Sequence, residues 1–174
     1  MGWTFCNAWD KKADVVAAIK VDMPNMIDSS VVNNTVFGLH EHDGARFISI
    51  TLLAKQRGQG WGYKSMHECD HPYYYNCPLR LLNLASPTTG QGLIWRAKVR
   101  QYHTTRAAKA ATVKKLAPGV RVKLVTGCTV MGDPVTEGTI LSVNPLLLLI
   151  GASFLPARFR KSLIAGIIEG DTPQ

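Results

Sequence analysis

Residues 60–78 constrain the fold of this chain more than any other stretch. They bring together a tryptophan, four tyrosines, two cysteines, two histidines and two prolines. A solvated connector rarely carries so many large rings, because ordering them in a loop costs conformational entropy. Gly60, Gly62, Pro72 and Pro78 restrict or redirect the backbone. The stretch is therefore predicted to be a rigid loop packed against the rest of the protein, and it contains no diagnostic catalytic motif.

Apolar periodicity and turn residues predict a mixed α+β fold. A helix is expected over residues 11–23, followed by a polar connector over 25–34. A β-hairpin is expected over residues 35–55, because its two halves are rich in strand formers and Asp43-Gly44 supplies a tight turn. The longest helix is expected over residues 92–116. The resulting architecture is a helix and a hairpin-based sheet packed on that long helix.

Pro118-Gly119 marks the predicted domain boundary. Beyond it the apolar period becomes two, with Val122 and Leu124 facing one way and Arg121 and Lys123 the other. Several short strands separated by glycine and proline turns are expected in the remaining residues. The sequence thus predicts an α+β domain over residues 1–117 and a small SH3-like β-barrel over residues 118–174.

Positive charge is concentrated in one part of the chain. The formal net charge is +8, and residues 71–132 contain ten lysines or arginines and no aspartate or glutamate. Residues 1–70 and 133–174 each carry a net charge of −1. Such a segment indicates an anionic partner, of which nucleic acid is the commonest. The alternative is a solvated face on a basic protein, and charge alone leaves both open.

Seven cations of the predicted long helix are the candidate binding residues. Lys114 and Lys115 also lie at the negative end of the helix dipole, which gives these two residues a structural role as well. No helix-turn-helix, zinc-finger or RNA-binding signature accompanies them, so the prediction of nucleic-acid or partner binding is electrostatic only. They are Arg96, Lys98, Arg100, Arg106, Lys109, Lys114 and Lys115.

A small enzyme is the alternative function. It would use one pocket formed by the 60–78 stretch, with Cys77 activated as a nucleophile by a histidine brought close by the fold. No glycine-rich nucleophile turn is present, and a buried inert thiol explains Cys77 equally well, so the sequence favours a non-enzymatic protein. The candidate catalytic residues are Tyr63, Lys64, Glu68, Tyr73 and Cys77.

Four side chains of the same stretch have the chemistry of zinc ligands, namely His67, Cys69, His71 and Cys77. Their spacing is not that of a regular zinc motif, and the alternative is that they fill gaps among the aromatic rings. We therefore expect no bound metal. No phosphate-binding glycine loop or dinucleotide fingerprint is present, so no cofactor is expected either.

The cysteines and the apolar segments bear on location. The four cysteines have no regular spacing, and no basic-then-apolar leader precedes them, which predicts a reducing, cytoplasmic setting. The most apolar run, residues 146–156, is too short to span a bilayer and soon meets Arg158, Arg160 and Lys161. No membrane association is expected.

A set of short motifs recurs in one known family. They are Met1-Gly2-Trp3, Phe5, a helix that begins near Lys11, Phe47-Ile48, Leu52-Leu53, Trp61-Gly62-Tyr63-Lys64, Met66, Glu68 and residues 72–78. With them the chain resembles a family of small proteins of bacteriophages, prophages and plasmids, the domain of unknown function 6927, closely over residues 1–85 and loosely over the basic helix and barrel. The resemblance implies an accessory protein of a mobile element in the bacterial cytoplasm. It brings no known activity, substrate or cofactor. Together with the basic segment, it leads us to expect a protein that contacts nucleic acid or a host nucleoprotein or defence complex, as a counter-defence inhibitor would. His67, Cys69 and His71 depart from the family pattern, which weakens the zinc interpretation.

Overall fold

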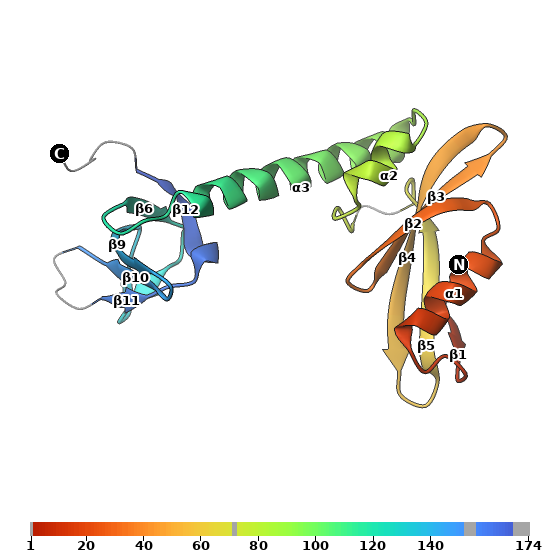
Figure 1. Ribbon diagram of the computed structural model, residues 1–174, viewed down its shortest axis with the longest axis horizontal. Coiled ribbons are helices and arrows are strands. Elements are labelled where there is room, and N and C mark those ends of the chain that lie inside the picture. The colour runs from red at the N-terminus through yellow and green to blue at the C-terminus, as the bar shows by residue number, and fades with distance from the viewer. Residues whose placement is uncertain (1, 71–72, 152–155, 169–174) are drawn as a thin grey trace. The chain divides into compact units, whose positions relative to one another are not determined.

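The computed structural model describes residues 2–70, 73–151 and 156–168. The chain divides into two compact units, Met1–Thr105 and Arg106–Gln174. The boundary expected from the sequence, between residues 117 and 118, lies further along the chain. The longest helix, α3 (Gly90–Lys114), begins in the first unit and ends in the second (Figure 1).

The first unit contains a five-stranded antiparallel sheet with the strand order β1-β5-β4-β3-β2. The predicted hairpin is confirmed as β3 and β4, in which His42 pairs with Ala45. Asp43 and Gly44 link them with φ angles of 49° and 75°, the positive values that a tight hairpin turn needs. The strands are β1 (Thr4–Cys6), β2 (Met26–Val32), β3 (Thr35–His42), β4 (Ala45–Gln56) and β5 (Gly60–His67).

Two sequence predictions for this sheet are wrong. Residues 26–32, expected in a connector, form the edge strand β2, which pairs only with β3 among the described strands. Residues 60–67, expected at the start of a rigid loop, form β5, which pairs with β4 on one side and β1 on the other. Gly62 had indicated a loop, but its backbone lies directly against β1, where a Cβ atom would sit 2.5 Å from Thr4 O.

Buried side chains cover both faces of this sheet. Val36 and Phe37 are neighbours in β3, and successive strand residues point to opposite faces. Val36 packs with Leu53 and with Val15 and Ile19 of α1 (Lys12–Asp22), which contacts β5 (Figure 1); we call this the α1-side cluster. The α3-side cluster covers the other face. It consists of Phe37, Leu39, Ile48, Ile50, Cys77, Leu81, Leu82, Trp95 and Val99, contributed by the sheet, α2 (Leu79–Leu84), α3 and the segment before α2.

The second unit also contains a five-stranded antiparallel sheet, of order β11-β10-β9-β6-β12. Its core includes Val122, Ile140 and Leu148, which are completely buried. Within the described residues the end strands β11 and β12 do not pair with each other, so the sheet stays open there. The elements are β6 (Arg121–Leu124), β7 (Thr129–Val130), β8 (Asp133–Pro134), β9 (Glu137–Val143), β10 (Leu146–Leu149), β11 (Ala157–Arg158), the short 3-10 helix η1 (Lys161–Leu163) and β12 (Ile164–Ile167).

Candidate nucleic-acid interface

Arg96 must be removed from the set of candidate binding residues. Its side chain is 6% exposed, and two of its nitrogens each lie 2.6 Å from a carboxylate oxygen of Glu68. A third nitrogen donates to Ser86 O. The charge of Arg96 is thus neutralised inside the first unit, and nucleic acid cannot reach it.

Lys98 and Arg100, also in the first unit, are exposed on α3. Lys98 Nζ lies 5.5 Å from the centroid of the Tyr75 ring, close enough for a cation–π contact. Within the described residues neither side chain forms an ion pair with a carboxylate. Both therefore keep their charge available to an anionic partner.

Four further candidate residues lie in the second unit, where α3 ends. Arg106, Lys109, Lys114 and Lys115 are all exposed. Lys109 Nζ donates a 2.8 Å hydrogen bond to Ser162 O, so this side chain also has a structural role. The other three form no ion pair with any carboxylate that the structure describes.

Few carboxylates oppose these cations. In the described part of the second unit the only acidic residues are Asp133 and Glu137, and Glu137 lies 3.3 Å from Arg121. The unit has nine lysines or arginines over residues 106–168. Uncompensated charge of this kind raises the local concentration of anions and speeds their association.

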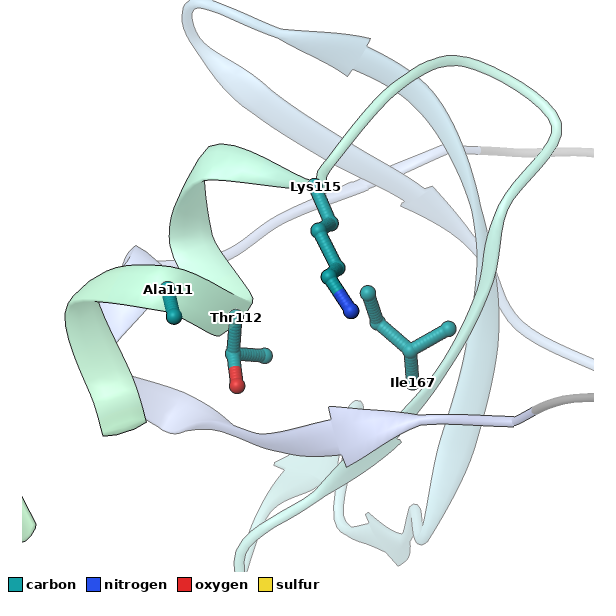
Figure 2. Close-up of a pocket in the computed structure, with 4 residues that line it drawn as sticks. All are labelled: Ala111, Thr112, Lys115 and Ile167. Atoms are coloured by element: carbon teal, nitrogen blue, oxygen red, sulfur yellow. The ribbon is translucent and has the colours of Figure 1, made fainter. Parts of the chain in front are cut away.

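Lys115 also borders a shallow cavity of about 210 Å³, together with Ala111, Thr112 and Ile167. Figure 2 shows the side chains of Lys115 and Ile167 pointing towards one another across it. The aliphatic stem of a lysine can cover an apolar neighbour while its ammonium group stays hydrated. Lys115 therefore lies beside an apolar side chain while it remains exposed.

Three further cations, Arg158, Arg160 and Lys161, were not among the binding residues predicted from the sequence. They border a concave surface of the second unit with Asn144 and Phe159. The run Arg-Phe-Arg-Lys is visible in the sequence. It lies in residues 133–174, where four acidic residues outnumber the three basic ones and give a net charge of −1. Two of the four acids in that segment, Glu169 and Asp171, lie outside the described residues. Charge counted over shorter windows would have found it.

The candidate catalytic residues do not share one pocket in the described residues. Tyr63 pairs across strands with Leu53 and packs on the α1-side cluster. Lys64 pairs with Leu52, which packs on the α3-side cluster, so the sheet separates Tyr63 from Lys64. Tyr63 Oη donates to Asp22, and burial together with this acceptor raises the pKa of Tyr63 to about 12. Tyr63 is therefore poorly suited to proton transfer at neutral pH.

The remaining catalytic candidates have structural contacts. Glu68 is 1% exposed and bound to Arg96, and Cys77 is completely buried. Burial and the nearby Glu68 carboxylate raise the pKa of Cys77 to about 12. His103 Nε2 lies 2.8 Å from Cys77 O, so the histidine contacts the backbone and does not activate the thiol. Tyr73 O accepts a hydrogen bond from Trp95 Nε1 at 3.0 Å.

No set of three metal-ligating side chains gathers in the part of the chain that the structure describes. His67 Nδ1 accepts a 3.1 Å hydrogen bond from Cys69 N, and Cys77 belongs to the α3-side cluster. His71, the fourth proposed ligand, lies outside the described residues. That the protein binds no zinc stays a prediction.

The described residues form a mixed α+β fold with two five-stranded antiparallel sheets and the two-stranded sheet β7-β8. None of its described helices has the length and apolar character needed to cross a membrane. No family model matches the chain, and neither a curated protein nor a solved structure is significantly similar to it.

Proposed function

We propose that this chain is a non-enzymatic protein that binds the phosphate backbone of nucleic acid, free or within a host nucleoprotein complex. The observation that carries the proposal is the group of exposed cations at the end of α3. Arg106, Lys114 and Lys115 have no carboxylate partner among the described residues. Lysines and arginines placed in this way neutralise phosphates and release counterions.

The resemblance to the mobile-element family belongs to the same proposal. It supports an accessory protein that acts in the bacterial cytoplasm and inhibits a host defence complex. A docked inhibitor and a backbone binder would use the same cations, because a nucleoprotein complex also presents phosphates. For the second unit we propose an SH3-like barrel, on the basis of its short antiparallel strands and their shared core.

The test is fluorescence anisotropy with a labelled single strand and a labelled duplex over a range of salt concentrations. We expect binding at low salt that weakens steeply as salt rises. The triple variant Arg106→Glu, Lys114→Glu, Lys115→Glu should lose most of this binding. The slope of log affinity against log salt concentration should fall by about one for each phosphate contact removed. Exposed charges contribute little to stability, so the fold should persist, which circular dichroism checks.

The matched control reverses three exposed cations of the first unit, by Lys20→Glu, Lys55→Glu and Arg57→Glu. It changes the net charge by the same amount and should leave most of the affinity. Equal losses in both triple variants would show that total charge, and not the end of α3, governs binding. Absence of any low-salt binding by the wild-type protein would contradict the proposal for free nucleic acid. A pull-down with a host nucleoprotein complex would then test whether the protein binds nucleic acid only within such a complex.

A further inference from the structure

The second unit has a concave surface that the proposed function does not use. It lies where the turn between β9 and β10 meets β11 and η1, and it encloses about 600 Å³. This volume falls within the range of roughly 300–1,000 Å³ that is typical of small-molecule sites. The pocket is therefore large enough for one nucleotide.

One part of its lining is cationic. Arg158 and Arg160 are exposed, and Lys161 is partly buried. Lys161 Nζ donates one hydrogen bond, of 2.7 Å, to Asn144 Oδ1, which leaves two donors for a ligand. Among the described residues, none of those that line the pocket carries a carboxylate. The chemistry of this part is that of a phosphate site, in which arginine can donate two parallel hydrogen bonds.

The rest of the lining is apolar. Pro145, Leu146, Phe159 and Leu163 contribute to it, and Phe159 is only partly buried although it packs against the core of the second unit. An aromatic or apolar surface next to cations suits a nucleobase attached to its phosphate, because every base has a flat face that can stack.

Backbone hydrogen bonds fix the main chain that carries these cations. Arg158 pairs with Leu147 in the sheet, Phe159 N donates to Leu146 O at 3.0 Å, and Leu163 N donates to Arg160 O at 2.9 Å. The run from Arg158 to Lys161 is thus anchored between β10 and η1. Because this main chain is already ordered, binding need not supply the free energy to order it.

We propose that this pocket takes one unpaired nucleotide of a single-stranded nucleic acid. Its phosphate lies against Arg158, Arg160 and Lys161, and its base lies against Phe159. The inference rests on the proposed function and makes it specific, since a base held in a duplex is paired and stacked and cannot enter such a pocket. The protein should therefore prefer single strands to duplexes.

The test compares three probes: a fluorescent oligothymidylate, a duplex of the same length, and free thymidine monophosphate followed by protein NMR. The variant Phe159→Leu keeps every charge and should weaken single-strand binding about tenfold, with little change for the duplex. The double variant Arg158→Gln, Arg160→Gln should lower single-strand affinity by at least as much. Its control is Lys20→Gln, Lys55→Gln, which removes two exposed cations of the first unit.

The results separate this inference from the proposed function. If both pocket variants bind the oligothymidylate as the wild-type protein does, while the variant at the end of α3 does not, the pocket inference is wrong and the proposed function stands. Equal losses for single strand and duplex in the arginine variant, with none in Phe159→Leu, would also overturn it. Thymidine monophosphate binding without oligothymidylate binding would assign the pocket to free nucleotides instead. Urea unfolding checks that each variant is folded.

Discussion

Glu68 and Arg96 form a two-point ion pair in the interior of the first unit, although 28 positions separate them in the chain. Arg96 Nε and Nη2 each lie 2.6 Å from one of the two carboxylate oxygens. Ile48 N also donates to Glu68 Oε1, at 3.1 Å. Buried charges persist only when paired and hydrogen-bonded in this way, and the pair links α3 to the sheet.

Breaking the Glu68–Arg96 pair should destabilise the protein. The variant Arg96→Leu leaves the Glu68 carboxylate buried without its counter-ion, which we expect to cost about 3–5 kcal/mol in urea unfolding. The double variant Glu68→Leu, Arg96→Leu removes both charges and should recover a large part of that loss. A single variant as stable as the wild-type protein would show that water or another group solvates Glu68.

The thiol of Cys77 should be unreactive in the folded protein. With a pKa near 12, the thiolate is about one in a hundred thousand of the molecules at neutral pH, and the side chain is completely buried. Maleimide labelling followed by peptide mapping should modify Cys6 or Cys69, which are partly exposed, at least about a thousandfold faster. Rapid labelling of Cys77 without denaturant would contradict this and revive the catalytic alternative.

Stability should fall on mild acidification because of His40. Burial, and secondarily the nearby His67, lower the pKa of His40 below 6.5 in the folded protein. The unfolded chain therefore binds a proton first as the pH falls through about 6.5, so the stability present above that pH is progressively lost below it. Urea unfolding at about pH 7.5 and about pH 5.5 should show this loss.

The variant His40→Gln provides the comparison for that pH effect. Glutamine can still hydrogen-bond to Ser49 Oγ, which lies 2.7 Å from His40 Nε2 in the native protein, but it does not titrate. The free energy of unfolding of this variant should change less between the two pH values than that of the wild-type protein, whatever its absolute stability. An unchanged pH dependence would assign the effect to other groups.

Gly62→Ala should weaken the contact between β1 and β5. The added methyl group would sit 2.5 Å from Thr4 O and would also meet the Phe5 ring, so β1 must shift, at a cost of roughly 1–3 kcal/mol. Gly166→Ala in β12 is the matched control, because a Cβ there meets nothing within 4 Å. Thermal unfolding measures both. Equal midpoints for the two variants would show that β1 adapts freely.

The hairpin was predictable because its signals are local. Strand-forming residues on either side of Asp43-Gly44 specify β3 and β4 without reference to the rest of the chain. The edge strand β2 was missed because Asp28, Ser29 and Ser30 lie within it, and an edge strand tolerates polar residues. The mixed α+β class followed from such local patterns.

The candidate site was less predictable because its residues depend on distant partners. Arg96 lies in a basic helix and looks like its neighbours in the sequence, and only the fold brings Glu68 beside it. Tyr63 and Lys64 are adjacent in sequence, and pairing with β4 places them on opposite faces. The glycines led to the wrong prediction of a loop where β5 lies. Gly62 is needed because β1 lies against its backbone, and not because the chain turns there.

The three residues of β1 also cover one edge of a longer strand. Thr4, Phe5 and Cys6 pair with Tyr63, Gly62 and Trp61, so they occupy the hydrogen-bonding edge of β5. An uncovered strand edge is a template on which a second chain can pair, by strand exchange or aggregation. A fusion or deletion that detaches so short a strand would free that edge. Detachment of β1 would therefore expose the longer strand β5 as a sheet edge, in place of an edge only three residues long.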